Sequence, residues 1–577
     1  MVSWEGNMSK GDMTVLIVMA IYVVVILIIG FAFAKRSNES SESYFIGGRK
    51  LGPWVTAMSA EASDMSGWLL MGLPGVAYFA GASEAMWTAI GLAIGTYLNW
   101  LFVAKRIRKY SEKAGNAITL PEYFSNRFGD TKHVLMTVSA LVILVFLSVY
   151  VGSCFATCGK LFSSTFGFSY GVMMIIGALL VFIYTFAGGY LSVCTTDLIQ
   201  GILMFFAIAI IFVGTLANIG GVDNAIAFLK DIPGFLSATQ SATPVLGPDG
   251  MTQVVEGGKP LFGTPGAYGI LTIVSTLSWG LGYFGMPQVL VRFFGIENPN
   301  NIRKSRIIAI IWCVISLALA ILIGLFGRAM LPAELLTAGD AEKIFIVISK
   351  MILPAFMTGI VVAGIFAATM SSSDSYMLIV GSAIAENIYR GLLKRDATDK
   401  QVMFVSRCTL VAVLIFGIII AQDPNSSIFR IVSYAWAGFG AAFGPVVLLS
   451  LYWRRANKNG ALAGMIVGAA TVIIWNLLET QFGGFFSLYE LLPGFIFALV
   501  VNVVVSLATK PPSDAVLDLF DHYMEDDYVA DPSIFGESRA KELIAATASG
   551  AAVVAAQAAA ATTREVQETL GAEGTDD

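Results

Sequence analysis

The sequence contains little charge for its length and almost no histidine. Only 13% of its 577 residues are Asp, Glu, Lys or Arg, and 56% are hydrophobic, whereas soluble domains have about 25% charged residues. This composition indicates an integral membrane protein and gives no sign of a nucleic-acid partner, which basic patches would indicate. Because His133 and His522 are the only histidines, a histidine-rich metal site is excluded.

The cysteines and the first apolar run exclude further classes of protein. The cysteines lie in or beside apolar runs, where packing as small residues is favoured over a disulfide framework: Cys154, Cys158, Cys194, Cys313 and Cys408. No small-residue cleavage site follows the first run, residues 13–34, so we expect a retained helix and not a cleaved signal peptide. No pattern of a nucleotide-binding or other soluble domain is present, and we expect a protein that is not an enzyme.

Apolar runs long enough to cross a bilayer recur up to residue 508. A span needs about 20 apolar residues, and such runs lie near 13–34, 53–82, 84–104, 134–162, 166–189, 190–219, 266–291, 307–330, 354–387, 402–421, 428–453, 459–481 and 485–508. We therefore predict an all-α polytopic membrane protein with about 13 transmembrane helices.

Basic residues gather in the connections on one side of the predicted membrane. By the positive-inside rule that side is the cytoplasm. We therefore expect a multi-pass protein of the plasma membrane with its N-terminus outside and its C-terminus in the cytoplasm. This expectation rests on Lys35, Arg36, Arg49, Lys50, Lys105, Arg106, Arg108, Lys109, Arg303, Lys304, Arg306, Lys394, Arg395, Arg454 and Arg455.

Three segments are not expected to cross the membrane. Residues 1–12 form an extracytoplasmic tail, and residues 220–265, rich in Gly, Pro, Ser and Thr, form an outside loop without a core of its own. Residues 511–577 form an acidic cytoplasmic tail that we expect to be disordered, although its Ala-rich end is able to form a marginal helix. The membrane domain is therefore expected over residues 13–510.

Two apolar runs are interrupted by small and polar residues. The stretch SAEASDMSGWLL places Glu61 and Asp64 inside the second run, although a charge at mid-bilayer costs about 3 kcal/mol. The ninth run carries five successive residues with oxygen ligands, Ser371, Ser372, Ser373, Asp374 and Ser375. Unwound backbone at membrane depth is tolerated where it lines a cavity, and such oxygens suit a hard cation such as Na⁺. We favour a cation site over the alternative, in which serine hydroxyls bond back to their own helix.

A third acid, Asp197, lies near the start of the sixth run. It is either a helix-start residue at the cytoplasmic interface, where a carboxylate suits the positive helix end, or a buried functional acid. Asp374 presents a similar choice between a buried site and a solvated position in the cytoplasmic vestibule. The sequence leaves both choices open.

The seventh run holds a glycine-rich motif with an aromatic pair. Residues 280–285, GLGYFG, match G-x-G-x-x-G, but we reject a dinucleotide site because the motif lies in a membrane span and not between a strand and a helix. We predict instead a helix thinned by glycine and kinked by Pro287. Trp279 and Tyr283 then share one face, where they either pack against lipid and core or hold an apolar ligand.

Three motifs resemble the sodium/solute symporter family, and most closely its bacterial sodium/proline symporters: FIGGRKLGPWVTAMSAEASDMSGWLLMGLPG, WGLGYFGMPQVLVRF, and SYAWAGFGAAFGPVVL with NGALAGMIVGA. The resemblance covers about residues 13–510. It implies a leucine-transporter-like fold with inverted repeats of five helices, one at about 53–219 and one at about 266–453, followed by extra helices at 459–508.

The resemblance also implies the ligand sites. The sodium ligands would be the carbonyls of Ala62, Met65 and Ala368 and the hydroxyls of Ser371 and Ser372, supported by Asp64 and Ser66. Proline would contact Ser59, Trp68, Tyr150, Trp279, Tyr283 and Pro287. A second cation site, which some relatives have, would use Asp197, Asp374 and Ser375.

The implied function is sodium-coupled import of L-proline by alternating access, with Na⁺, proline and the lipid bilayer as partners. The sequence departs from the proline symporters at three positions. These transporters have Phe, Gly and Gln where this chain has Trp54, Glu61 and Met286. Two alternatives therefore stay open: a symporter of another small amino acid or carboxylate, and a transporter-like sensor. The lack of a folded output domain argues against the sensor.

Overall fold

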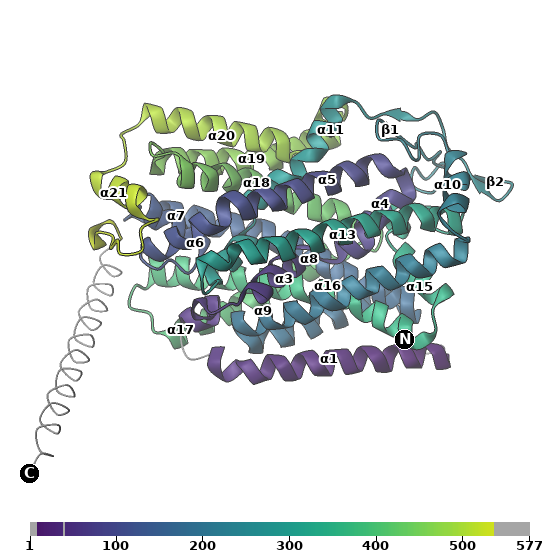
Figure 1. Ribbon diagram of the computed structural model, residues 1–577, viewed down its shortest axis with the longest axis horizontal. Coiled ribbons are helices and arrows are strands. Elements are labelled where there is room, and N and C mark those ends of the chain that lie inside the picture. Colours follow the sequence, from purple (N-terminus) through teal and green to yellow (C-terminus); the bar gives the residue numbers. More distant parts are fainter. Residues whose placement is uncertain (1–8, 38–40, 536–577) are drawn as a thin grey trace, which may run out of the picture.

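The chain folds into a bundle of long helices. The computed structural model describes residues 9–37 and 41–535, and its long helices run roughly parallel to one another (Figure 1). The start of α1 (Lys10–Ser37) lies at the same end of the bundle as the strands, whereas α21 (Asp514–His522) lies at the opposite end (Figure 1). The two ends of the described chain thus lie at opposite ends of the bundle.

Within the described residues, ten helices are long and apolar enough to cross a membrane. The all-helical polytopic class is confirmed, but this measure does not reproduce the expected 13 helices. The second and seventh runs are broken into short helices, and the fifth run is a shorter apolar segment, Tyr170–Phe186. The difference therefore comes from spans that are divided.

The first half of the core begins with the broken helix of the second run. The broken helix consists of α3 (Pro53–Asp64), the π-helical turn η2 (Trp68–Gly72) and α4 (Leu73–Ala80). The other elements of this half are α5 (Ala82–Leu98) with η3 (Asn99–Val103) and α6 (Ala104–Lys113); α7 (Leu120–Arg127); α8 (Val134–Phe166); and α9 (Tyr170–Ile219). The fifth and sixth runs are the two parts of α9, which bends at Gly189, where φ is 69°. Glycine adopts this conformation without strain.

The second half also begins with a broken helix. Its segments are α11 (Ile270–Leu277), η4 (Ser278–Phe284) and α12 (Pro287–Gly295); η5 (Pro299–Asn301) and α13 (Ile302–Met330); the short helices α14 (Ala338–Ala341) and α15 (Ile344–Ile352); α16 (Ala355–Ser382) with η6 (Ala383–Leu393); α17 (Asp399–Ile420); and α18 (Ile428–Tyr452). The break falls at Gly285 and Met286, and Pro287 begins α12. The kink predicted at Pro287 is a complete break of the helix between Phe284 and Pro287.

The remaining helices flank these two halves. They are α1, α2 (Ser41–Ile46), η1 (Gly47–Arg49), α19 (Lys458–Phe482), η7 (Gly484–Ser487) and α20 (Leu491–Ala508). Helix α1 packs against α9 and α16, while α19 and α20 pack against each other and against α18.

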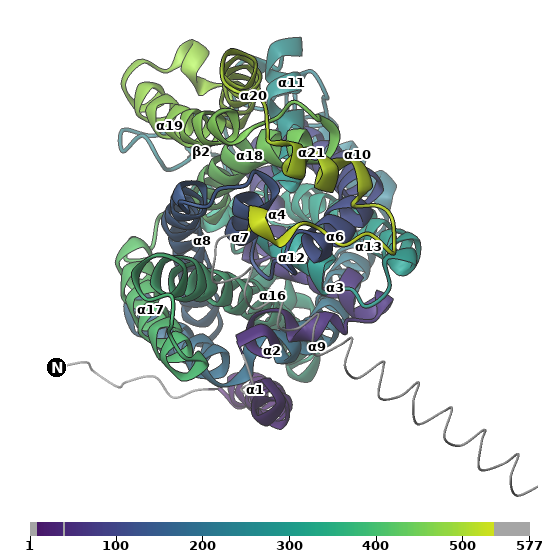
Figure 2. The ribbon, with the colours of Figure 1, turned by 90° about the vertical axis from the view of Figure 1, so that its left-hand side faces the viewer.

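Helix α16 lies at the centre of the bundle (Figure 2). It packs against α3, α8 and α9, and every residue from Val361 to Ser382 is buried. Elsewhere in the core, α5 and η4 approach through glycine, because a Cβ on Gly95 would lie 2.2 Å from the carbonyl oxygen of Gly280. The core thus holds the two broken helices and the serine-rich part of α16 close together.

Residues 220–265 pack onto the helices instead of forming a free loop. The segment contains α10 (Val222–Lys230), β1 (Gln240–Ser241), β2 (Val255–Glu256) and β3 (Lys259–Pro260); β2 pairs antiparallel with β3, and β1 with β4 (Gly266–Ala267). Phe235 is fully buried, and its carbonyl accepts a hydrogen bond from the Ala82 amide at 2.8 Å. The segment is therefore joined to the start of α5.

The first part of the acidic tail packs against α6. It comprises α21 and the turn η8 (Pro532–Ile534). The ring of Tyr523 stacks on Tyr110 with 4.2 Å between centroids. Arg454 donates to Asp521 at 2.9 Å, and these hydrogen bonds lower the pKa of the Asp521 carboxyl. The expected Ala-rich helix lies outside the described residues.

Candidate functional site

The second run is unwound just after Asp64. Met65 leaves the helical region with φ −88° and ψ 78°, and the amide of Ser66 donates to the Asp64 carbonyl at 3.1 Å. In a continuous helix that amide would donate to the carbonyl of Ala62. The break therefore frees the Ala62 carbonyl inside the protein core, as the small residues around the two acids predicted.

Two serines of α16 face the freed carbonyl. The Ser371 hydroxyl donates to the Ala62 carbonyl at 2.8 Å, and the Ser372 hydroxyl lies 3.5 Å from the same oxygen. Ser371 also lies 3.1 Å from the carbonyl of Ala368. The structure thus brings together oxygens of four predicted sodium ligands from two helices that are about 300 residues apart in the sequence, as chain separations of 309 and 310 residues show.

The oxygens around the break fit a hard cation. They come from carbonyls, hydroxyls and one carboxylate, all in fully or almost fully buried residues, and such oxygens are the ligands of hard cations. Within the described residues, Asp64 Oδ1 and Ser66 Oγ are buried and have no hydrogen-bond partner. Met65 is the C-cap residue that directly follows α3. A buried carboxylate oxygen without a donor is costly, and a cation beside it removes that cost.

The expectation of an interrupted ninth run is wrong. Helix α16 continues from Ala355 to Ser382 through the whole serine-rich stretch. Its hydroxyls bond back to carbonyls one turn earlier, Ser371 to Ala368 and Ser373 to Thr369, so they satisfy polar groups without opening the helix. Only one of the two predicted breaks at this site exists, and α16 contributes hydroxyls to it.

Three aromatic side chains close around the same break. Tyr283 donates to Asp64 Oδ2 at 2.7 Å. The indole nitrogen of Trp68 and the hydroxyl of Tyr150 donate to the Asp64 carbonyl at 3.1 Å and 3.2 Å. Asp64 therefore links two groups of residues. Its sequence neighbours Ala62 and Met65 supply predicted sodium ligands, and its own oxygens accept hydrogen bonds from the aromatic residues.

Trp279 and Tyr283 do not face lipid. Their side chains are 3% and 1% exposed, so the lipid-facing alternative is wrong. Trp279 lies against Trp68, with ring centroids 6.2 Å apart, and stacks on Tyr489 at 5.0 Å. Together with Phe429 at 5.2 Å, these rings form an aromatic layer above the break.

A second polar cluster surrounds Asp197 and contains a residue that sequence reasoning missed. Arg292 lies 3.3 Å from Asp197 Oδ2, and its guanidinium also donates to Ser59 at 3.0 Å and to Ser375 at 2.5 Å. Ser59, expected at the proline site, donates to Asp197 at 2.6 Å. The signal that would have identified Arg292 is its charge at the end of the seventh run, one residue after the stated bound of 291 and before the apolar Phe293 and Phe294, since intramembrane ionisable residues mark functional sites.

Both acids of this cluster are fully buried. Asp197 lies inside α9 and Asp374 inside α16, and neither is exposed. The interfacial position considered for Asp197 and the solvated position considered for Asp374 are therefore wrong. Asp374 Oδ1 accepts a hydrogen bond from Ser375 at 3.3 Å, whereas Asp197 Oδ1 and Asp374 Oδ2 have no hydrogen-bond partner in the described part of the chain.

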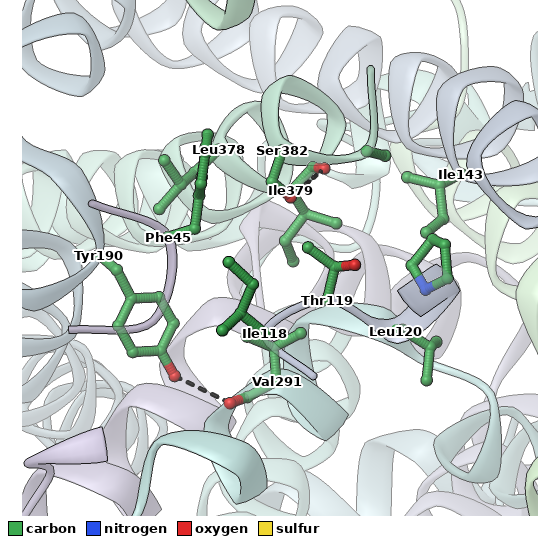
Figure 3. Close-up of a pocket in the computed structure, with 12 residues that line it drawn as sticks. Phe45, Ile118, Thr119, Leu120, Ile143, Tyr190, Val291, Leu378, Ile379 and Ser382 are labelled. Carbon is green, nitrogen blue, oxygen red and sulfur yellow. Dashed lines mark hydrogen bonds between the residues drawn. The ribbon is translucent and has the colours of Figure 1, made fainter. Parts of the chain in front are cut away.

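Space in the core is unequal on the two sides of these clusters. An outer cavity of about 560 Å³ reaches Trp279 from the end of the bundle that carries the strands. At the other end an inner cavity of about 10 Å³, enough for about one water, lies among Phe45, Val291 and Ile379 (Figure 3). There the hydroxyl of Tyr190 points to the Val291 carbonyl, at 3.0 Å (Figure 3). This inner cavity is therefore too small for a solute.

Known proteins match both the sequence and the fold. A family model described as the sodium:solute symporter family matches residues 44–468. The high-affinity proline transporter PutP of Bacillus subtilis (strain 168) is 42% identical over 500 residues, which cover 86% of this chain and 99% of that protein. The sodium/proline symporter of Escherichia coli (strain K12) is 40% identical over 527 residues, which cover 91% and 99%.

A solved structure shows the same architecture. A Na⁺-coupled sialic acid symporter in a substrate-bound outward-open state matches with a TM-score of 0.68 at 21% identity, over 87% of this chain and 99% of that chain. This likeness confirms the leucine-transporter-like fold. The matched family consists of transporters and not enzymes. The ten long apolar helices found in the described part of the chain make it a multi-pass membrane protein. The chain belongs to the sodium:solute symporter family.

Proposed function

We propose that the protein imports L-proline together with Na⁺ across the bacterial plasma membrane by alternating access. The observation that carries this proposal is the position of Asp64, which follows the freed Ala62 carbonyl by two residues and accepts a hydrogen bond from Tyr283. Oxygens that suit a cation and aromatic groups that suit a small zwitterion therefore meet at one helix break. The names of the similar transporters supply the substrate.

Sodium is proposed to bind at the break in the second run. Its ligands are the carbonyls of Ala62, Met65 and Ala368 and the hydroxyls of Ser371 and Ser372, with Asp64 and Ser66 in support. The ion replaces the hydrogen bond from Ser371 to Ala62, and its charge compensates the burial of Asp64. One Na⁺ that moves down ~100 mV and a tenfold gradient releases about 2.3 plus about 1.4 kcal/mol, enough for about several hundred-fold accumulation of a solute.

Proline is proposed to bind between the break and the aromatic layer. Its ring suits the walls formed by Trp68, Tyr150, Trp279 and Tyr283, because apolar aromatic walls hold small rings. Its carboxylate suits amides freed at the helix breaks, where Pro287 begins α12. Ser59 is proposed to act at the inner boundary of this site through its bonds to Asp197 and Arg292.

The cluster around Asp197 is proposed as a second cation site. Asp197 and Asp374 carry two negative charges, and Arg292 is the cation that hydrogen bonds there to Asp197 and Ser375. One carboxylate is thus left for Na⁺ or a proton, because two buried carboxylates repel each other.

The proposed orientation places the inner cavity toward the cytoplasm. The basic connections around α6 and the tail helix α21 lie at one end of the bundle, and the positive-inside rule assigns that end to the cytoplasm. The N-terminal tail and residues 220–265 are then outside.

Uptake into proteoliposomes tests the function. We expect an inward Na⁺ gradient to drive accumulation of labelled proline, and unlabelled proline to compete better than other small amino acids or carboxylates. A better competitor would assign another substrate to the same symport. Gradient-independent binding without uptake would instead favour the sensor alternative.

Replacement of Asp64 tests the ion site. We expect Asp64→Asn to raise the Na⁺ concentration for half-maximal uptake about tenfold or more, because the lost charge acts on the cation. Uptake at a series of Na⁺ concentrations measures this, with Asp223→Asn, an exposed acid of α10, as the control. Unchanged Na⁺ dependence in a correctly inserted Asp64→Asn protein contradicts the assignment.

Replacement of Trp279 tests the substrate site. We expect Trp279→Ala to weaken proline affinity by roughly 1 to 3 kcal/mol, the scale of one buried aromatic contact. The control is Trp54→Ala, which removes a 62% exposed indole. The apparent affinity for proline is measured by uptake in both variants. A change under about twofold for Trp279→Ala speaks against a role of Trp279 in substrate binding.

The ratio of charge flux to proline flux tests the second cation site. We expect either more than one charge per proline or uptake that depends on pH, and we expect Asp374→Ser to abolish that behaviour because it removes the second carboxylate. Asp396→Ser, at an exposed acid, is the matched control. Strict one-to-one coupling that neither pH nor Asp374→Ser alters leaves the site without support.

A further inference from the structure

The docked part of the acidic tail lies across the end of the bundle that holds the inner cavity. This part comprises residues 514–535, which we call the tail strap, and its yellow ribbon crosses the face of the bundle turned toward the viewer in Figure 2. Its acidic side chains are exposed, but Leu519 is fully buried, and Tyr523 and Phe535 are 3% and 2% exposed. An acidic segment that buries such side chains has a defined docking surface, unlike a disordered segment.

Helix α6, on which the strap lies, is joined to the inner pieces of both broken helices. Arg108 of α6 donates to the carbonyl of Ile296, just after α12, at 2.8 Å. Arg49, which precedes α3, donates to Ser111 of α6 at 3.1 Å and to the Phe294 carbonyl of α12 at 2.8 Å. Both guanidinium groups belong to buried residues. Helices α3, α6 and α12 therefore form a first group that is tied together at the inner end.

A second group consists of α7, α8 and α18. Ser450 near the end of α18 accepts a hydrogen bond from Arg127 of α7 at 2.8 Å, and its hydroxyl lies 2.9 Å from that of Tyr123. Both α7 and α18 pack against α8. The inner cavity lies on the boundary between the two groups, because Val291 of α12 and Ile143 of α8 both line it (Figure 3). A path through the inner end therefore requires the two groups to separate.

The strap binds the first group through exposed charges. Lys109 of α6 donates to Asp526 Oδ1 at 2.8 Å, and Lys113 donates to the Tyr528 carbonyl at 2.7 Å. The hydrogen bond and the charge of Lys109 lower the pKa of the Asp526 carboxyl. Because Asp526 is 89% exposed, salt screens this pair readily.

The strap binds the second group through one ion pair and one ring. Asp521 pairs with Arg454, just after α18, at 2.9 Å. The ring of Phe520 lies 4.7 Å from the guanidinium carbon of Arg127, a distance at which a cation and a ring attract each other. Within the described residues, two nitrogens of that buried guanidinium have no hydrogen-bond partner. Water would bind them when the strap leaves, which offsets the lost ring contact and makes docking reversible.

We propose that the tail strap is a salt-sensitive restraint that holds the two helix groups together and slows the opening of the inner end. Its contacts with both groups exist only while the groups lie side by side, so they favour the closed inner end over the open one. A rise in ionic strength weakens the exposed pairs and releases the restraint. The proposal goes beyond the proposed function and holds for any solute that leaves through the inner end.

Reactivity of a thiol at the inner cavity measures how often that end opens. Ser382 lines this cavity, and Ser382→Cys places a thiol there. Cys408→Ser removes the exposed native cysteine, while the other four are buried. The probe is a charged methanethiosulfonate, which reacts when water reaches the thiol, and the sample is purified full-length protein in Na⁺ buffer at about 50 mM salt, where exposed pairs are weakly screened. The same protein without Ser382→Cys gives the background.

Changes in the strap should accelerate this reaction. We expect Asp521→Asn combined with Asp526→Asn to raise the rate about fivefold, the scale for loss of two exposed ion pairs. Tyr523→Ala, which removes the ring stacked on α6, should raise the rate as well. The matched control is Asp527→Asn, at the exposed neighbour of Asp526, which should leave the rate unchanged. Because Asp521 and Asp526 are exposed, the double variant keeps the test decisive if Tyr523→Ala fails to fold.

Ionic strength tests the electrostatic part of the restraint. At constant Na⁺, an increase of choline chloride to about 500 mM screens exposed pairs strongly. We expect the rate to rise in the protein with an unaltered strap and to stay unchanged in the double variant Asp521→Asn, Asp526→Asn, which has already lost both pairs. An equal rise in both proteins overturns the role of these pairs.

The remaining outcomes separate this proposal from the proposed function. A rate that neither the double variant nor Tyr523→Ala raises overturns the restraint. A lower rate also overturns it, because the strap would then favour the open inner end. Absence of proline uptake by the unaltered protein overturns the proposed substrate but leaves the strap in place, since the thiol reaction is measured without proline.

Discussion

The architecture depends on how the protein satisfies one carbonyl group that a membrane helix has released. An unpaired carbonyl in an apolar core costs about 2–7 kcal/mol, and the Ala62 oxygen avoids this cost through the Ser371 hydroxyl at 2.8 Å. That hydroxyl also lies 3.1 Å from Ala368 of its own helix. An ion that takes the Ala62 oxygen therefore lets the hydroxyl hydrogen turn back to Ala368, and the helices keep their positions. The Ser371 hydroxyl thus exchanges one hydrogen-bond acceptor for another, and the surrounding helices stay folded.

Buried ion pairs fix the helices on both sides of this break. Arg292 joins α12 to Asp197 of α9, and Lys160 of α8 lies 2.7 Å from Glu342, whose carboxylate accepts from amides at the start of α18. Removal of one partner from a buried pair costs about 3–5 kcal/mol, because the other charge is left without compensation. Such pairs are weak sources of net stability but strong constraints on which helices lie side by side.

The sequence was informative where local chemistry decides structure. Small residues around Asp64 and the glycines before Pro287 predicted two breaks, because both lower the cost of leaving a helix. The serine run of α16 was misleading, since hydroxyls satisfy helix carbonyls as readily as they satisfy an ion. Arg292 could not be assigned a partner, because Asp197 lies 95 residues away. The two residues become neighbours because α9 and α12 both pack against α3 and α16.

The inequality of the two cavities follows from the same broken helices. Because residues 65–67 separate α3 from the second piece, formed by η2 and α4, the inner piece is able to move while the outer piece stays in place. The inner end is held by apolar contacts and by the hydrogen bond from Tyr190 to Val291, and at the outer end the aromatic layer at Trp279 lies between the outer cavity and the break. To open the outer barrier, Tyr489 must give up its hydrogen bond to the Ser433 carbonyl at 2.9 Å, just as the inner end must give up the hydrogen bond from Tyr190 to Val291 at 3.0 Å. The outer cavity reaches the aromatic layer directly, so a solute that enters from that end meets this layer before the helix break.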